Sequence, residues 1–191
     1  MNWNYPLSVN IDGEEYKIKN QCDYRNVLNI MVLYEDANFS LETKTQVAFE
    51  MFYENYKSIK NKQKAVLEMI RVLNGLREDE VERVSNSKEP EKPRIMSWKQ
   101  DFSLIAPEIS KTLGYNIQEP GRYTHWWSFT SAYMAINSEC AWSTFLSIRK
   151  KRIYGKKLEK WEEEIYRDNR KRIDLEIPLT DEEKEWLEGD D

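Results

Sequence analysis

The chain has 191 residues, of which 40% are hydrophobic, 13% aromatic and 33% charged, and its formal net charge is −5. This size and composition exclude wholesale disorder and allow one domain, or two small ones, with an apolar core. No run of about 18 apolar residues could span a bilayer, and the first residues lack the basic start and apolar stretch of a signal peptide, so we expect a cytoplasmic protein.

The first predicted element is a β-hairpin. Apolar residues alternate with polar ones on both sides of Asp12-Gly13, a pair that favours a two-residue hairpin turn. The alternating apolar residues are Leu7, Val9, Ile11, Tyr16 and Ile18. We therefore expect two short antiparallel strands near the start of the chain.

Three amphipathic helices are predicted to follow the hairpin. Asp23 and Ser40 are suited to cap the first two, because their side-chain oxygens accept hydrogen bonds from backbone amides of the first turn. The hairpin and the helices predict a compact first unit over residues 1–77. The apolar stripes, at helical spacing, are Val27, Ile30, Met31 and Tyr34; Val47, Ala48, Met51, Phe52 and Tyr56; and Ala65, Val66, Met69, Ile70, Leu73 and Leu76.

A charged linker is predicted over residues 78–94. Between Arg77 and Arg94 the sequence loses nearly all apolar residues and gains charges, serines and two prolines. Such a composition favours a linker, because it cannot bury enough apolar surface to fold. We place a domain boundary there.

The second predicted unit, over residues 95–173, begins with a helix capped by Ser97 and stopped by Gly114. Its apolar stripe is Trp98, Phe102, Ile105, Ile109 and Leu113. Pro107 lies inside this stripe. A proline in a helix interior costs about 3 kcal/mol, so we expect a kink or two short helices there.

Three more aromatic stripes are predicted in the second unit. The first is Trp126, Phe129, Tyr133 and Ile136, widened by Trp127 and Met134, and indicates a largely buried helix. The second is Trp142, Phe145 and Ile148, and the third is Leu158, Trp161 and Ile165. The predicted fold class is thus mainly α, with an N-terminal β-hairpin followed by two small helical units joined by a charged linker.

Charge is distributed unevenly near the end of the sequence. Arg149 to Arg172 contains 11 basic and 5 acidic residues, whereas Ile173 to Asp191 contains 1 basic and 9 acidic residues. We expect a basic segment followed by an acidic tail over residues 174–191.

His125 is the only histidine and lies beside Trp126 and Trp127. A histidine can serve as a general base, but it needs a nucleophile or an orienting carboxylate, and no serine or cysteine occurs in a GxSxG motif. We favour a packing role, with the imidazole beside one of the two indoles and one nitrogen hydrogen-bonded to a nearby loop. A zinc site with Cys22 and Cys140 lacks any helpful spacing, and both cysteines are expected to stay reduced.

No cofactor-binding motif can be written for this chain. Its six glycines are scattered, so neither GxGxxG nor a P-loop occurs. We expect no enzyme activity and predict no catalytic, cofactor-binding or metal-binding residues.

The alternative functional candidate is the basic segment Arg149 to Lys157, which has Tyr154 within it and Trp161 nearby. Lysines and arginines neutralise phosphates, and aromatic rings stack on bases, so this segment could bind a nucleic acid. Glutamates at positions 159 and 162–164 dilute this charge, so nucleic-acid binding is the less favoured interpretation.

Several stretches resemble a small bacteriophage family from tailed phages and prophages of Gram-positive bacteria. They are NQCDYRNVLNI, KAVLEMIRVLNGL, MSWKQDFSLIAPEISKTLGYNI, THWWSFTSAYMAI and FLSIRKKRIYGKKLEKWEEEIYRDNRKR. The resemblance spans roughly residues 5 to 175. The most specific element is the aromatic-flanked His125-Trp126-Trp127 that follows the Gly-Tyr-Asn-Ile loop, and the tail after Ile173 has no counterpart.

The resemblance implies a role in phage tail assembly. In such phages the gene lies just ahead of the tape-measure gene, the position of the tail assembly chaperones. It implies a chaperone that keeps the long, apolar tape-measure protein soluble in the host cytoplasm until tail-tube subunits replace it. No catalytic residues come with the family. Such a role favours self-association into a homo-oligomer, because linked weak contacts add up along a filament.

Overall fold

The computed structural model describes residues 4–76, 93–176 and 187. The predicted linker over residues 78–94 lies outside the described residues except for its last two positions. Most of the predicted acidic tail also lies outside them. No described helix is both long enough and apolar enough to cross a membrane.

The chain divides into two compact units, each built from two stretches of sequence. The first unit contains Met1–Lys88 and Gly121–Ser131, and the second contains Glu89–Pro120 and Ala132–Asp191. The segment around His125 therefore groups with the first unit, although the sequence pattern assigned it to the second. The contacts of its two tryptophans, described below, give the reason.

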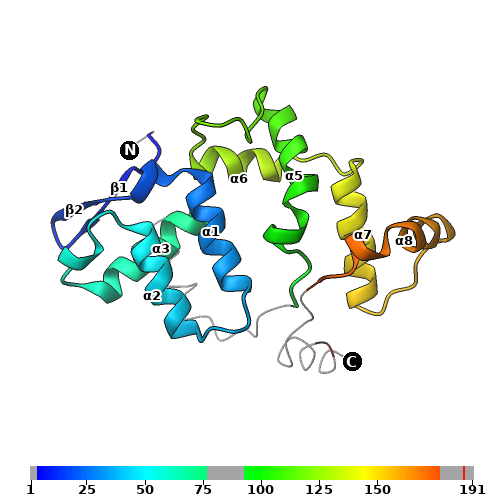
Figure 1. Ribbon diagram of the computed structural model, residues 1–191, viewed down its shortest axis with the longest axis horizontal. Helices are drawn as coiled ribbons and strands as arrows, with labels where there is room; N and C mark the ends of the chain where they lie inside the picture. The colour runs from blue at the N-terminus through cyan, green and yellow to red at the C-terminus, as the bar shows by residue number, and fades with distance from the viewer. Residues whose placement is uncertain (1–3, 77–92, 177–186, 188–191) are drawn as a thin grey trace. The chain divides into compact units, whose positions relative to one another are not determined.

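The mainly α fold and its hairpin are confirmed. Strands β1 (Ser8–Ile11) and β2 (Glu14–Lys17) pair antiparallel with Ile11 opposite Glu14 (Figure 1). Asp12 and Gly13 have φ angles of 53° and 88°, the left-handed pair that a type I′ turn requires. Val9 and Ile11 are buried while their neighbours face solvent, so the alternation is that of a half-buried strand.

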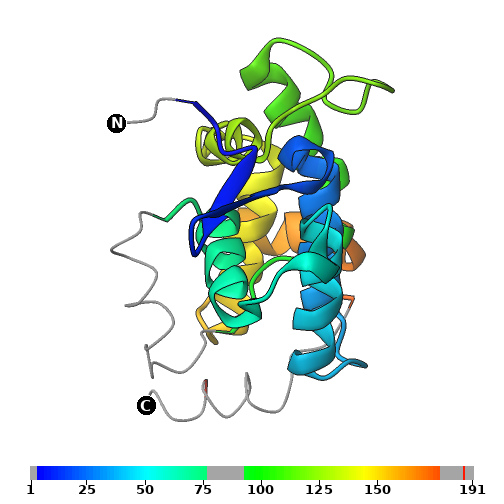
Figure 2. The same cartoon turned by 90° about the vertical axis from the view of Figure 1, so that its left-hand side faces the viewer.

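Three helices complete this part of the first unit: α1 (Tyr24–Glu35), α2 (Leu41–Phe52) and α3 (Lys62–Asn74). The predicted caps are confirmed, because Asp23 accepts a hydrogen bond from the Arg25 amide and Ser40 from the Thr43 amide. Helices α1 and α2 lie side by side, and the hairpin lies beside α3 (Figures 1 and 2). The buried residues of these helices include Val27, Ile30, Ala48, Phe49, Phe52, Ala65, Met69, Val72 and Leu73.

Two predicted members of the second stripe are not in the core of α2. Helix α2 ends at Phe52, and Tyr56 begins a separate 3₁₀ helix, Tyr56–Ser58. Val47 is 38% exposed. At 100° per residue, Val47 lies about 160° around the helix from the buried Phe49, so the two cannot share one face.

A left-handed turn joins the hairpin to α1. Asn20, Gln21 and Cys22 have φ angles of 52°, 53° and 59°, a region that side chains with a Cβ rarely adopt. The left-handed conformation costs roughly 1–2 kcal/mol per residue. The turn is held by burial of Cys22 and by the Tyr123 hydroxyl, which donates to the Gln21 carbonyl at 2.8 Å.

Replacing Gln21 with glycine is expected to raise the free energy of unfolding by about 1 kcal/mol, because glycine adopts this backbone conformation without strain. The Gln21 side chain is exposed, so little packing is lost. Urea denaturation followed by circular dichroism measures the change. Lys17→Gly, at an exposed strand position, is the matched control and should destabilise the protein. Equal losses in both variants would contradict the strain argument.

The second unit contains α5 (Trp98–Leu113), α7 (Ala141–Ile153) and α8 (Lys160–Ile173), and the boundary between units falls within α6 (Trp126–Met134). Of the two outcomes predicted at Pro107, two short helices are wrong, because α5 continues through the proline as one helix. The proline removes the amide that would bond the Ser103 carbonyl. Both Ser103 and Pro107 are exposed, so water can satisfy this carbonyl.

The second unit buries or half-buries most residues of its predicted aliphatic and aromatic stripes. Two exceptions are Met134, which is 84% exposed, and Trp161, which is 54% exposed. Both were predicted on buried stripes. Next to Trp161, α8 buries Glu162 instead. The Glu162 carboxylate accepts hydrogen bonds from the Lys151 ammonium group and the Glu159 amide. The buried hydrophobic residues of this unit include Ile105, Ala106, Ile109, Ile117, Trp142, Phe145, Ile148 and Ile173.

Candidate functional site: an apolar groove on helices α2 and α3

His125 is a buried capping residue of α6. The residue is only 3% exposed, and its Nδ1 accepts a hydrogen bond from the Trp127 amide at 3.0 Å. Since Nδ1 is an acceptor, the proton lies on Nε2, which donates to the Pro6 carbonyl at 3.2 Å. The imidazole is therefore neutral, with both nitrogens engaged.

The two tryptophans beside His125 cap the end of α3. The Trp126 indole donates to the Leu73 carbonyl and the Trp127 indole to the Val72 carbonyl, both at 2.8 Å. Carbonyls in the last turn of a helix lack the usual amide donor four residues on, so the indoles supply donors there, in addition to the Gly75 amide that donates to the Val72 carbonyl at 3.3 Å. The His125 ring stacks on Tyr5 with 4.5 Å between ring centroids. The predicted packing role of His125 is confirmed.

Burial lowers the pKa of His125, against the opposing effects of the Pro6 hydrogen bond and the Asp23 charge. An unfolded chain has a histidine pKa of about 6.5. Since the folded pKa is the lower one, the contribution of the neutral ring to stability is present above about pH 6.5. It is lost as the pH falls below that value toward the folded pKa.

We expect the stability of the protein to fall as the pH is lowered below about 6.5, and we expect His125→Gln to flatten this fall. Glutamine removes the titrating group while keeping a donor and an acceptor. Urea denaturation at a series of pH values measures the slope. As His125 is the only histidine, an NMR titration of its ring protons reports its pKa directly. A folded pKa above that of the unfolded chain would contradict this expectation.

The cysteines do not form a reactive or metal-binding cluster in the part of the chain that the structure describes. Cys22 is buried, and desolvation raises the pKa of its thiol to about 12, so it stays protonated near neutral pH. Cys140 is the N-cap of α7, where its sulfur accepts from the Ser143 amide. Among the described residues, no group of three histidine, cysteine or carboxylate side chains could hold a metal ion.

The basic segment Arg149 to Lys157 is only partly available as a surface. Arg149 is 2% exposed and forms an ion pair with Asp101, whose nearest oxygen lies 2.7 Å away. Lys151 pairs with Glu162 at 2.7 Å. Arg152 pairs with Asp174 and lies over the Tyr166 ring. Lys150, Lys156 and Lys157 are exposed.

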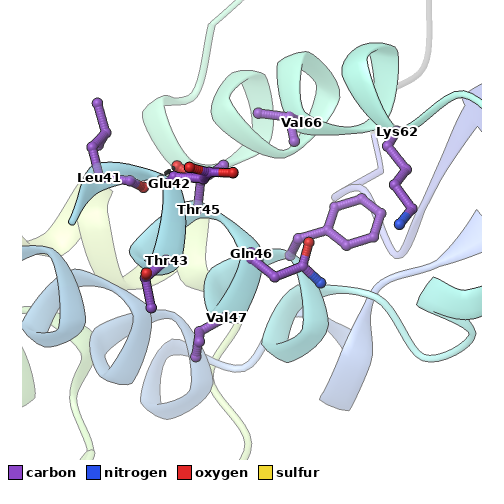
Figure 3. A pocket seen from close by; sticks show the side chains of 9 residues that line it. Leu41, Glu42, Thr43, Thr45, Gln46, Val47, Lys62 and Val66 are labelled. Carbon is purple, nitrogen blue, oxygen red and sulfur yellow. Dashed lines mark hydrogen bonds between the residues drawn. The ribbon is translucent and has the colours of Figure 1, made fainter. Parts of the chain in front are cut away.

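A groove of about 670 Å³ lies on α2 and α3 and is lined mainly by apolar surface. Phe49 contributes from the buried side, and Leu41 and Val47 are exposed along its edges. In Figure 3, Val66 and Lys62 come from α3, and Thr45 and Gln46 come from α2 and lie between the two helices. A volume of this size is within the range of about 300–1,000 Å³ typical of binding pockets.

Exposed apolar residues cluster at the start of α2, beside this groove. Phe39 is 48% exposed, Leu41 is 71% exposed and Val47 is 38% exposed. Exposed apolar residues beside a groove are typical of interaction surfaces. The sequence pattern missed this surface because Val47 was counted in a core stripe and Leu41 received no role. The position of Val47, about 160° around the helix from Phe49, was the sequence feature that could have indicated its exposure.

A family model described as Bacteriophage Gp15 protein matches residues 1–175 of the chain. No curated protein and no solved structure gives a significant match.

Proposed function

Because the chain belongs to the bacteriophage Gp15 protein family, we propose that it is a non-enzymatic tail assembly chaperone that keeps the tape-measure protein soluble in the host cytoplasm. The observation that carries this proposal is the exposed apolar groove on α2 and α3. The resemblance described above supplies the partner, a long apolar helical protein.

The groove suits an apolar helix. Two helices form the surface, with the exposed Leu41 and Val47 on α2 and the half-buried Val66 on α3. An amphipathic helix binds such a groove through anchors spaced three or four residues apart. Its polar lining includes one acidic residue, Glu42, and one basic residue, Lys62. This balance gives no preference for a strongly charged partner, which favours an apolar helix over a nucleic acid.

The small size of the groove implies weak binding per copy. It can accept only a few side chains, and fully burying one leucine or valine contributes about 1.5–3 kcal/mol. Many copies along one tape-measure chain, with contacts between neighbouring copies, would compensate for this weakness. We therefore propose that the protein self-associates on its partner, and that tail-tube subunits later displace it.

The alternative function, nucleic-acid binding through Arg149 to Lys157, has less support. Three of the six basic residues of this segment are buried or already paired, namely Arg149, Lys151 and Arg152. A phosphate backbone would therefore meet half of the charge that the sequence suggests. A gel-shift that is absent at low salt would remove this alternative.

Co-expression with the tape-measure protein tests the proposed function. The wild-type chain is expected to raise the soluble fraction of the tape-measure protein, and the double variant Leu41→Glu, Val47→Glu is expected to abolish this effect. A charge in place of an apolar anchor should weaken binding by at least about 10-fold, because roughly 1.4 kcal/mol corresponds to a factor of 10. Light scattering during size exclusion measures self-association.

Met134→Glu is the matched control for the groove variant. Met134 is 84% exposed and lies outside the groove, so the same change of charge there should leave the soluble fraction unchanged. Thermal unfolding of each variant shows that the fold is intact. If the wild-type chain is monomeric and leaves the tape-measure protein insoluble, the chaperone proposal fails. If the groove variant keeps the tape-measure protein as soluble as the wild-type chain does, the assignment of the groove fails.

A further inference from the structure

The groove on α2 and α3 has a single charged residue at each end. Of the residues that line it, only Glu42 and Lys62 are charged. Figure 3 shows Glu42 at one end of the groove and Lys62 at the other, with Gln46 between them. Both charged residues are exposed. The groove therefore has an acidic end and a basic end, although its two charges cancel.

Neither charge is neutralised within the part of the chain that the structure describes. Glu42 and Lys62 form no ion pair and no side-chain hydrogen bond there. Lys60 and Lys64, which lie on either side of Lys62 in the sequence, pair with carboxylates of the hairpin at 3.3 Å and 3.0 Å. The two lining charges are thus available to a bound chain.

The nearest other charged residues of α2 are already engaged. The Lys44 ammonium group donates to the Tyr34 carbonyl at 2.9 Å, and the Glu50 carboxylate accepts from the Gln46 amide group at 2.7 Å. Both Lys44 and Glu50 are half-buried, and neither lines the groove. They therefore leave the opposite charges of Glu42 and Lys62 as the ones that an occupant would meet.

Lys62 is placed unfavourably for its own helix. It is the first residue of α3, and no acidic residue lies in the first turn of that helix. The N-terminus of a helix carries partial positive charge, so a lysine there is repelled. Glu42 lies in the first turn of α2, where a negative charge is favourable and is partly offset by the helix. The basic end is therefore the stronger of the two, and an acidic group from a partner would stabilise it.

The separation of the two ends corresponds to about two turns of helix. Glu42 and Phe49 both line the groove and lie seven residues apart on α2, which is about 10 Å. The start of α3, with Lys62, lies beside the end of α2, because the Tyr53 hydroxyl donates to the Ala65 carbonyl at 2.7 Å. Seven residues of a bound helix also span about 10 Å and return to the same face.

We propose that the groove binds an amphipathic helix that carries one basic and one acidic residue about two turns apart beside its apolar anchors, and that the order of these charges sets the direction of the bound helix. The basic residue pairs with Glu42 and the acidic residue with Lys62. A helix with its basic residue first runs parallel to α2, and one with its acidic residue first runs antiparallel. This inference rests on the proposed function, because it specifies which segments of the tape-measure protein the same groove accepts.

The preference for one direction is expected to be modest. Exposed ion pairs contribute little individually, but the wrong direction replaces two attractive contacts with two repulsive ones. Together these four differences correspond to a preference of about 10-fold for the matched direction. The apolar anchors supply the affinity, whereas the charges select the direction.

Two synthetic peptides test the proposal on the full chain. Each is an alanine-based helix of about 20 residues with blocked ends, with leucines between a lysine and a glutamate seven residues apart, and with a spin label beside its first charged residue. The lysine-first peptide should broaden the amide NMR signals of Leu41 and Thr43 more than those of Lys62 and Val66. The glutamate-first peptide should give the opposite result.

Charge exchange in the protein provides the matched control. The variant Glu42→Lys, Lys62→Glu should exchange the results of the two peptides, and Glu42→Gln, Lys62→Gln should remove the directional preference. Thermal unfolding shows that each variant is folded. If both peptides bind in the same direction, or if the exchanged variant leaves the directions unchanged, this inference is overturned while the groove remains a helix site. If neither peptide binds, the groove assignment in the proposed function fails together with it.

Discussion

Replacing Arg149 with methionine is expected to lower the free energy of unfolding by about 3–5 kcal/mol, because it leaves a buried charge without its partner. Asp101 is 1% exposed, and its two oxygens accept from Arg149 at 2.7 Å and 2.9 Å. Methionine has a similar length but no donor. The Asp101 carboxylate would keep only its hydrogen bond from the Ser97 amide.

The remaining contacts of Arg149 explain why a charged residue is buried here. Its other N–H groups donate to the backbone carbonyls of Ile95, Arg172 and Ile173. A guanidinium has five donors, and the five acceptors around Arg149 match them in number. This side chain therefore joins the start of α5, the middle of α7 and the end of α8. Arg149→Lys cannot supply this geometry and should recover little of the loss.

Chemical denaturation of Arg149→Met, compared with Arg167→Met, measures the effect. Arg167 pairs with Asp168 on the surface, with side chains 74% and 67% exposed, so its replacement should change stability by no more than about 0.5 kcal/mol. Similar losses in the two variants would contradict the role of Arg149. Amide hydrogen exchange in α5, α7 and α8 locates the loss within the second unit.

Local rules were sufficient to predict most elements of the fold. The Asp12-Gly13 turn and the caps at Asp23, Ser40 and Ser97 are confirmed, because each depends on residues within a few positions. The prediction of two short helices at Pro107 is wrong because it ignored the exposure of the freed carbonyl. The loss of one helical hydrogen bond destabilises a helix less when water can reach the freed carbonyl. The local sequence around Pro107 does not show which side of the helix faces water.

The role of charged residues was the least predictable from sequence. Arg149 was read as surface charge because it belongs to a run of basic residues, whereas its partner Asp101 lies 48 positions earlier. Glu162 was read as one of several glutamates that dilute the basic charge, yet it is buried against Lys151. Local spacing cannot identify such distant partners, so a count of charges overstates the surface available to a ligand.

The candidate groove was missed for a related reason. Helical spacing groups apolar residues within about 100° of one another into one stripe, and it does not show where the core ends along the helix. Leu41 lies in the first turn of α2 and Val47 faces away from Phe49, so both remain exposed. The candidate binding surface therefore contains apolar residues, Leu41 and Val47, that lie outside the core.

Replacing Trp126 with alanine is expected to lower the free energy of unfolding by about 3–5 kcal/mol, the range observed for large aromatic residues in cores. Trp126 is 3% exposed, and its ring stacks on Phe129 with centroids 5.4 Å apart. The substitution also removes the hydrogen bond to the Leu73 carbonyl at the end of α3. It should therefore release the end of α3 from the start of α6 within the first unit.

Trp126→Phe separates packing from hydrogen bonding at this position. Phenylalanine keeps part of the ring but has no N–H, so the Leu73 carbonyl loses its indole donor at a cost of about 1–3 kcal/mol. Trp161→Ala is the matched control, since this exposed indole should contribute no more than about 0.5 kcal/mol to stability. Far-ultraviolet circular dichroism during urea denaturation is the suitable measurement, because removing a tryptophan alters fluorescence. If Trp126→Ala costs no more than Trp161→Ala, the cluster around His125 does not hold the first unit together.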